Sequence, residues 1–486
     1  MDSDRQPGLL DLRSYLAPAL ETVPAPDGWW SGPRRWWAGA LDAEGLALGS
    51  IGALVSALAA LDSAQGDAAS GSRVATSSAL VAASFDSIRH LRVDGNSADI
   101  WAPMSGFRRT RDGWVRLHAN YPHHAERLLA AMGMTSADQL DAALLERDAL
   151  EIEDAVRSGG GVAAAVRTPD EWAATPMGLA AAGEPWVGLA LDEAPSPRPL
   201  PHDGVGGLPL SGIRVLDLTR VIAGPSATRL LGALGADVLR VDPPQHPELL
   251  DAHLDTGFAK RSAVADLRNP EQAARVRTLA GEADVVLLGY RQASLARYGL
   301  DIDSLREAFP HLAVVALSAW GWTGPWADGR GFDSIVQAAC GIAHLYGGLP
   351  AGTGASSTVP PGRAPSGPST RDAAWRPGAL PVQALDHATG MAVAASAVAL
   401  LAVRSRGVTG SARLSLIATA NELLRASVPD PSGGPVALVV ETRHADSAYG
   451  RLDFVPPPLI LDGTQLEYPH PSERYGSAPL GWSHRG

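Results

Sequence analysis

Residues 213–241 read IRVLDLTRVIAGPSATRLLGALGADVLRV. The apolar run at 213–218 is typical of a short buried strand, and Pro225 follows at the position where a helix tolerates proline best. Ala and Leu then recur at helical spacing as far as Gly235, and a second apolar run covers 236–241. Strand, tight turn, helix and strand make one βαβ unit.

The same alternation continues along the chain. It predicts helices at 270–280 and 303–308 and strands at 284–288 and 313–319. Alternation of this kind predicts an α/β fold with a Rossmann-like parallel sheet. Ligands of such sheets bind at the carboxyl ends of the strands, and here those ends carry residues 221–226, 289–291 and 320–325.

Composition excludes several classes of function. The 486 residues carry a formal net charge of -12, which argues against nucleic acid as a partner. The single cysteine, Cys340, excludes an internal disulfide framework and a cysteine-based metal cluster, so no metal is expected. The glycines after Leu218 do not make a G-x-G-x-x-G fingerprint, so no nicotinamide cofactor is expected. The charged start resembles no secretory signal, and no uninterrupted apolar run spans a membrane, so we expect a cytoplasmic protein.

A second, smaller α+β domain is predicted at 86–191. It contains a hairpin at 107–117 and helices at 122–132 and 137–157. Adjacent histidines on a helix point in different directions, so His123 and His124 are expected on the surface. The Pro- and Gly-rich stretch 192–211 is the clearest linker in the chain.

Asp386 opens a long helix. The sequence ALDHATG at 384–390 leads into an Ala-rich run, as far as Val403, that is apolar on nearly every face and is therefore expected to be buried. A carboxylate in the first turn gains from the helix dipole, which favours its ionised form. From this stretch alone, a plain N-cap aspartate is the favoured interpretation, because Asp is a preferred cap.

The start of the chain has a similar layout. Residues 1–85 contain another Ala-Leu-Asp sequence, at 40–42, followed by an apolar helix to Leu61 and a second apolar stretch at 73–85. A degenerate internal repeat of 384–427 and chance similarity between two Ala-rich helices both explain this. Under the first explanation Asp42 becomes a candidate second carboxylate. The remaining predicted segments are a Rossmann-like domain at 212–346, a Gly/Pro-rich loop at 347–379, the Asp386 helix segment at 380–428 and a Pro/Gly-rich tail at 429–486.

Several ordered motifs resemble the family III CoA transferases of the formyl-CoA and carnitine CoA transferase type. The similarity covers roughly 212–427 and rests on Val215-Leu216-Asp217-Leu218-Thr219-Arg220, Ala223-Gly224-Pro225, Leu234-Gly235-Ala236-Asp237-Val238, Lys260-Arg261-Ser262, Ala283-Asp284-Val285-Val286, Arg297-Tyr298-Gly299-Leu300, Phe332-Asp333, and Asp386 ahead of Thr389-Gly390. Each motif is weak alone, and their order carries the resemblance.

The resemblance implies CoA transfer between an acyl-CoA and a carboxylic acid acceptor, with Asp386 as the nucleophile. It also implies coenzyme A contacts at Val221, Ile222, Ala223, Lys260, Arg261, Tyr290, Arg297 and Phe332. Lys260 is the one lysine in a chain whose other basic residues are arginines, which suits a position that needs a compact ammonium group. A homodimer is expected, because members of the family form interlocked dimers.

Two alternatives stay open. The related α-methylacyl-CoA racemases carry a histidine where this chain has Phe332, ahead of Asp333, and a racemase needs both an acid and a base. A non-catalytic acyl-CoA-binding paralogue is the other alternative. In the family the small domain follows the catalytic helix, whereas here it precedes the Rossmann-like part, so the segment order is expected to be permuted.

Overall fold

A computed structural model describes residues 9–20, 27–34, 36–65, 74–193, 199–200, 207–348, 375–427 and 435–483, with only the backbone of Gln292. Most of the predicted loop at 347–379, and much of the predicted linker at 192–211, lie outside these residues.

The centre of the fold is a seven-stranded sheet in the order β11-β10-β9-β12-β13-β14-β8. Its strands are β11 (Arg261–Val264), β10 (Asp237–Asp242), β9 (Arg214–Leu218), β12 (Val285–Leu288), β13 (Ala313–Ser318), β14 (Val408–Ser415) and β8 (Val187–Glu193). All neighbours are parallel except β8, which runs antiparallel to β14. The predicted α/β fold with a parallel sheet is confirmed.

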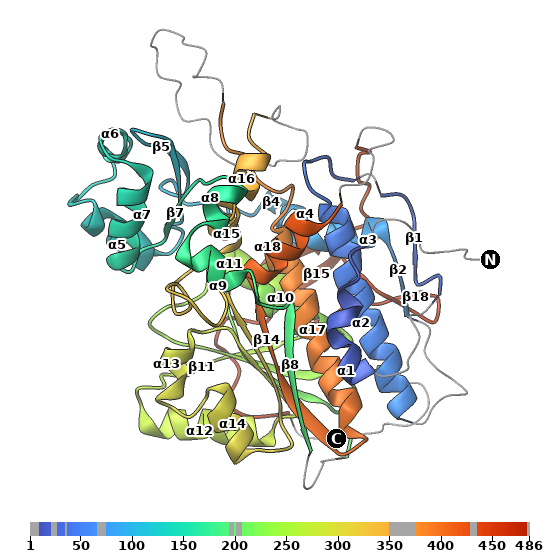
Figure 1. The fold of residues 1–486 in the computed structure, drawn as a ribbon. Coiled ribbons are helices and arrows are strands. Elements are labelled where there is room, and N and C mark those ends of the chain that lie inside the picture. The colour runs from blue at the N-terminus through green and yellow to red at the C-terminus, as the bar shows by residue number, and fades with distance from the viewer. Residues whose placement is uncertain are drawn as a thin grey trace.

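Alternate side chains of the four strands β10, β9, β12 and β13 enter two different cores. Val215 faces a core that includes α10 (Ala223–Ala233) and α17 (Ala384–Arg404), whereas Leu216 faces α12 (Pro270–Glu282) and α14 (Ile302–Ala308). Helices therefore cover both faces of the sheet (Figure 1). This alternation follows from the period of two along a strand.

The long helix α17 is buried over its whole length. On the side away from the sheet it packs along α2 (Ala43–Ala64), which comes from the start of the chain (Figure 1). Among the described residues these two helices are long and apolar enough to cross a membrane, so the expectation that no such segment exists is wrong. Their most apolar windows are 89% and 100% buried inside the fold, so both are core helices here.

The segments after α2 and α17 follow the same order of elements. α2 leads to β2 (Val74–Ser77) and α3 (Ser78–Phe85), and α17 leads to β14 and α18 (Leu416–Arg425). Ser77 and Ser415 each cap the following helix by accepting a hydrogen bond from the backbone three residues on, both at 3.2 Å. β2 joins a small separate sheet and not the central one, and the internal repeat stays a prediction.

A smaller unit is built on β5 (Gly106–Arg109), β6 (Trp114–Leu117) and β7 (Ala163–Ala165), with α5 (Pro122–Ala131), α6 (Leu140–Leu145) and α7 (Ala149–Ser158) packed on them around a core of their own. The predicted hairpin is confirmed. The helix expected at 137–157 is divided in two, because Asp148 and Glu151 form a capping box that starts α7. After α8 (Pro169–Ala173) and α9 (Pro176–Ala181), β8 returns the chain to the edge of the central sheet.

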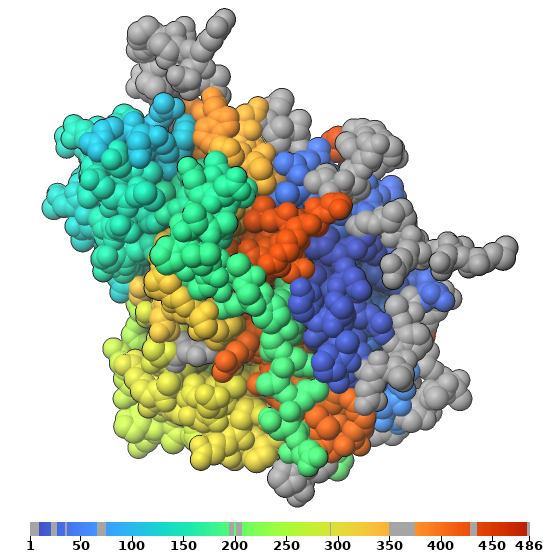
Figure 2. Space-filling model, viewed as in Figure 1, coloured from blue at the N-terminus to red at the C-terminus, as the bar shows by residue number. Residues whose placement is uncertain are grey.

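Segments far apart in the sequence meet on one face of the molecule. Figure 2 shows the blue N-terminal region, green residues near β8 and orange α18 side by side. The hydroxyl of Tyr15 donates to Glu422 (2.8 Å), and the indole of Trp186 donates to Thr419 (3.0 Å). The tail also pairs with distant strands: β16 (Gly450–Phe454) joins β3 (Arg92–Val93), and β17 (Ile460–Leu461) joins β2. The other described elements are η1 (Leu12–Leu16), α1 (Ala17–Leu20), β1 (Trp30–Ser31), α4 (Ser87–His90), β4 (Asn96–Ser97), α11 (Leu250–Thr256), α13 (Gln292–Ala296), α15 (Asp333–Ala339), α16 (Ile342–Leu345), β15 (Arg443–Ser447) and β18 (Thr464–Gln465).

Gly390 lets α10 approach α17, because a side chain there would collide with the backbone carbonyl of Ala223. Gly390→Ala is therefore expected to lower the free energy of unfolding by about 1–3 kcal/mol. In an open helix the same change raises stability by about 1 kcal/mol, so the sign is diagnostic. Urea denaturation measures it, with Gly183→Ala as the control because no atom lies within 4 Å of that added Cβ. A Gly390→Ala variant as stable as the wild type would contradict this close packing.

Candidate active site

A cavity of about 570 Å³ opens where the parallel strands end. Val221 after β9, Gly289 and Tyr290 after β12, and Trp322 after β13 all contribute to its wall. The cavity lies at the strand ends where a ligand site is predicted. We call it the main cavity.

The structure brings most of the predicted site residues together. Those that line the main cavity are Val221, Ala223, Tyr290, Arg297, Phe332 and Asp386. Ile222 lines a second cavity of about 210 Å³, and Asp386 lines both. Lys260 and Arg261 line neither of these two cavities.

The main cavity carries three arginines without a described carboxylate partner, Arg291, Arg297 and Arg330. Arg291 and Arg297 are exposed at its mouth. Burial and the neighbouring Arg291 and Arg127 lower the pKa of Arg330 to about 10, which leaves it charged at neutral pH. Arginine binds phosphate through its planar fork of donors, so this wall suits a phosphorylated ligand.

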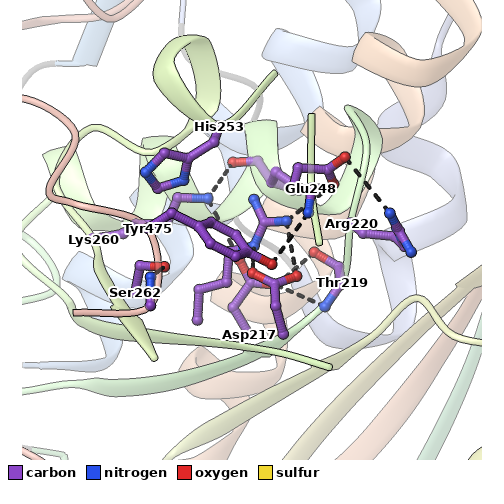
Figure 3. A network of polar contacts seen from close by, with 12 residues as sticks. Asp217, Thr219, Arg220, Glu248, His253, Lys260, Ser262 and Tyr475 are labelled. Atoms are coloured by element: carbon purple, nitrogen blue, oxygen red, sulfur yellow. Dashed lines mark hydrogen bonds and ion pairs between the residues drawn. The ribbon is translucent and has the colours of Figure 1, made fainter. Parts of the chain in front are cut away.

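The turn between β9 and α10 is held by a buried acid, Glu248 (Figure 3). Val221 has a φ of 71°, which is strained for a β-branched residue, and its N–H donates to Oε2 of Glu248 (2.8 Å). The same carboxylate accepts from the hydroxyl of Tyr121 (2.5 Å) and from Arg240 (3.0 Å). Burial alone raises the pKa of Glu248, but the charges of Arg240 and Arg220 outweigh it and lower the pKa to about 2. The turn is thus fixed by a permanently ionised group.

Lys260 lies beneath this turn (Figure 3). Its buried Nζ donates to Oγ1 of Thr228 (2.7 Å) and to the carbonyl of Pro225 (2.9 Å), and it lies 3.4 Å from Oδ2 of Asp217. Burial lowers its pKa to about 7. Here the ammonium group supports the start of α10 and does not reach the cavity, where the resemblance had implied a coenzyme A contact. Arg261 pairs with Asp237 (2.7 Å) on the strand beside it.

Asp386 is the third residue of α17, whose N-cap is Gln383, so its interpretation as an N-cap aspartate is wrong. Its carboxylate is 6% exposed and accepts no hydrogen bond from a described residue. Burial, and then the negative charge of Asp333, raise the pKa of Asp386 well above its usual range. The helix dipole was expected to keep this group ionised, but desolvation outweighs the dipole at this depth.

Asp333 is fixed against the backbone of Asp386. The N–H of Asp386 donates to Oδ2 of Asp333 (3.0 Å), and the side-chain amide of Gln337 donates to Oδ1. Gln337 is oriented in turn by the N–H of Leu380 (2.9 Å). Burial raises the pKa of Asp333 to about 6. Two buried carboxyl groups at one site resist ionising together, so the pair holds a proton near neutral pH.

The smaller unit supplies cavity residues that the sequence did not indicate. Tyr121, His123 and His124 at the start of α5 all line the main cavity. His124 is 4% exposed, so its expected surface position is wrong. His118, at the end of β6, stacks on Phe332 with ring centroids 3.7 Å apart. The contact between His118 and Phe332 joins two segments that are far apart in the sequence, so no local sequence pattern predicts it. Among the described residues no group of three or more His, Cys, Asp or Glu is placed to hold a metal.

Residues 210–448 match the family model described as CoA-transferase family III. The match covers just under half of the chain. The matched segment contains Asp386, Asp333, Lys260 and the turn at Val221, whereas the β5–β7 unit precedes it.

Curated relatives match a part of the chain. The succinate–glutarate CoA-transferase of Agrobacterium fabrum is 41% identical over 157 residues, covering 29% of this chain and 39% of that protein. The succinyl-CoA–L-malate CoA-transferase beta subunit of Chloroflexus aurantiacus is 39% identical over 158 residues, covering 30% of this chain and 39% of that protein. The chain thus spans about two fifths of the length of these relatives. A crystal structure of Rv3272 from M. tuberculosis aligns with a TM-score of 0.36 at 30% identity, covering 45% of this chain and 57% of that one.

Lys260 and Arg297 are expected to respond differently to substitution. Lys260→Met leaves Asp217 buried and unpaired, which costs about 3–5 kcal/mol of unfolding free energy. Arg297→Ala removes an exposed cation, so stability is unchanged and the dissociation constant for coenzyme A rises about two- to five-fold. Urea denaturation and titration calorimetry measure the two effects. A Lys260→Met protein of wild-type stability with weakened coenzyme A binding would restore Lys260 as a direct contact.

Proposed function

We propose that this protein is a CoA transferase that moves coenzyme A between an acyl-CoA and a carboxylic acid, with Asp386 as its nucleophile. The observation that carries the proposal is the position of Asp386: a buried carboxylate, free of hydrogen bonds from described residues, in the wall of both cavities. The match of residues 210–448 to the model of CoA-transferase family III supports the same activity, and so do the similar proteins that are CoA-transferases.

The main cavity is proposed to hold coenzyme A. Arg291, Arg297 and Arg330 offer charge to the nucleotide phosphates, and Tyr290 and Phe332 offer apolar wall. The thioester then lies toward Asp386, and the acyl group enters the second cavity. Val221 and Ala223 form the edge of the turn beside α17, where α10 begins.

The proposed reaction proceeds through covalent intermediates on Asp386. A carboxylate oxygen of Asp386 attacks the thioester carbonyl carbon, the carbon–sulfur bond breaks, and coenzyme A leaves as a thiolate. The thiolate attacks the aspartyl carbonyl of the resulting anhydride, releasing the first acid and leaving an aspartyl-CoA thioester. The acceptor carboxylate displaces the thiolate to form a second anhydride. Attack of the thiolate on the acceptor's carbonyl gives the new acyl-CoA and regenerates Asp386.

Asp386 must be ionised to act as a nucleophile, and the neighbouring carboxyl group of Asp333 makes that ionisation less favourable. Because burial and the charge of Asp333 raise the pKa of Asp386, its anion forms less readily than that of an exposed aspartate. A less solvated carboxylate is also a stronger nucleophile once formed, since no hydrogen bond from a described residue holds it back. We therefore propose that rate increases with pH through the titration of the pair.

An isomerase is the second candidate, and one observation favours it. His118 lines the second cavity together with Asp386, although Phe332 stands where the related racemases carry histidine. Burial and the charge of Arg116 lower the pKa of His118 to about 3, so the ring is neutral at neutral pH but a weak base, which counts against its removing a proton. Such a pair would exchange the hydrogen on the acyl α-carbon.

The homodimer, the cytoplasmic location and the permuted segment order also stand as proposals. The permuted order is supported by two helix–strand–helix segments, α2-β2-α3 and α17-β14-α18. One precedes the smaller unit in the chain and the other follows it.

Incubation with a panel of acyl-CoAs is expected to leave an adduct on the peptide that carries Asp386. Hydroxylamine or borohydride trapping, followed by intact-mass and peptide analysis, detects it. Asp386→Asn should abolish the adduct, because the amide is a poor nucleophile, while coenzyme A binding by calorimetry persists. Asp42→Asn is the matched control, since Asp42 opens the similar helix α2 but pairs with Arg34.

Two other outcomes would contradict the proposal that the protein is a CoA transferase. Coenzyme A binding without an adduct from any donor would leave the non-catalytic paralogue. Deuterium incorporation at the acyl α-carbon in D₂O, without an adduct, would establish the isomerase in its place.

Asp333→Asn is expected to move the acid limb of the pH–rate profile for adduct formation to lower pH by about one unit or more. Asp333 raises the pKa of Asp386 through its charge, so removing that charge lets Asp386 ionise at lower pH. Asparagine can still accept the hydrogen bond from the N–H of Asp386. Exposed Asp154→Asn serves as the control. An acid limb that stays in place or moves upward would show that the two carboxyl groups do not titrate together.

A further inference from the structure

The second cavity is lined by residues from both halves of the chain. Trp101, Phe107, Arg116 and His118 come from the smaller unit and the segment leading to it, and Phe332 and Asp386 come from the family III segment. The cavity measures about 210 Å³, against about 570 Å³ for the main cavity. A short acid suits this space better than a long acyl chain.

Arg116 is a buried cation in this wall. It lies on β6 and is 6% exposed. Its guanidinium lies over the rings of Trp101 (4.7 Å) and Phe107 (4.8 Å), which hold its plane by cation–π contact. Nε has no hydrogen-bond partner, and no described carboxylate lies within ion-pair distance. Burial lowers its pKa to about 10, so it stays charged at neutral pH.

Several other charged residues around the cavity have partners, whereas Asp99 and Asp386 in its wall have no described ion-pair partner. Arg89, the other arginine in the wall, lies 3.3 Å from Asp86. Asp255 accepts from Arg229 (3.3 Å), and Asp251 accepts from the N–H of Asp99 (2.8 Å). Asp333 influences Arg116 through a longer-range electrostatic interaction and forms no described ion pair with it. Among the described lining residues, Arg116 is the one arginine left for an anion inside the cavity. Leaving a charge buried and unpaired is costly, and a bound carboxylate removes that cost.

We propose that Arg116 binds the distal carboxylate of a dicarboxylic acid whose other carboxyl group reacts at Asp386. The inference rests on the proposed function, because Asp386 marks the reacting end. A planar guanidinium held between two rings offers a carboxylate two parallel hydrogen bonds, which fixes both the position and the direction of the acid. Arg116 is then the residue that selects dicarboxylates over monocarboxylates of the same length.

The test compares succinyl-CoA and glutaryl-CoA with butyryl-CoA and pentanoyl-CoA as donors to Asp386. The wild-type protein should form the adduct at lower concentrations of the first pair. Arg116→Gln should raise the half-saturating concentration for the first pair about ten- to hundred-fold and leave that for the second pair unchanged. Arg116→Lys keeps the positive charge but lacks the planar guanidinium. Its half-saturating concentration for the first pair should lie between those of the wild type and Arg116→Gln. Arg109→Gln, an exposed arginine on the adjacent β5, is the matched control.

A second measurement separates this inference from the proposed function. Titration calorimetry of free glutarate and free pentanoate against Asp386→Asn requires no chemistry. Glutarate binding that is lost in Asp386→Asn/Arg116→Gln supports Arg116 even if no donor acylates Asp386. Adducts that form equally well from both classes of donor, or glutarate binding that ignores Arg116, would overturn the inference and leave the transferase standing. If Arg116→Gln fails to fold, the Arg116→Lys variant and the wild-type preference between the two classes decide the question in the same way.

Discussion

The burial of α17 is the constraint on which the rest of the structure depends. All of its residues are inside the fold, so it needs apolar neighbours on every side. The sheet and α10 supply one side and α2 supplies the other, and Gly390 lets the backbone of α10 come close. A helix covered in this way carries the residues of its first turn into the interior. Asp386 is therefore desolvated by the same packing that forms the core, and its raised pKa follows from the fold.

The ionisable side chains of the interior are of two kinds. Those with an ion-pair partner stabilise the fold, and those without one are candidates for binding or reaction. Arg404 lies 2.8 Å from Asp284 beneath the sheet, and Lys260 lies against Asp217 beneath the turn. Such pairs fix backbone and leave no capacity for a ligand. Asp386, which accepts no hydrogen bond from a described residue, and Arg116, which has no described carboxylate partner, instead face a cavity. Charged groups held in this way bind or react strongly, because little solvent competes with their partners.

The sequence predicted what local patterns determine. Periods of two and 3.6 residues located β9, α10, β10 and the strand ends that line the main cavity. The rest depends on contacts between distant segments. Retention of one lysine indicated that Lys260 matters, but a compact cation suits a buried pair as well as a phosphate. His124 and Arg116 read as ordinary polar residues of a small domain, because the partners that bury them, Phe332 and Phe107 among them, are fixed only by tertiary structure.

The arrangement also divides the site between two parts of the chain. Asp386 and the arginines Arg291, Arg297 and Arg330 lie within the segment that matches the family model of CoA-transferase family III. Arg116, on strand β6 of the smaller unit, and His118, just after that strand, lie outside this segment. Helix α15, which begins with Asp333, packs against β6 and β7, so the strand that carries Arg116 contacts the helix whose first residue accepts the hydrogen bond from the N–H of Asp386.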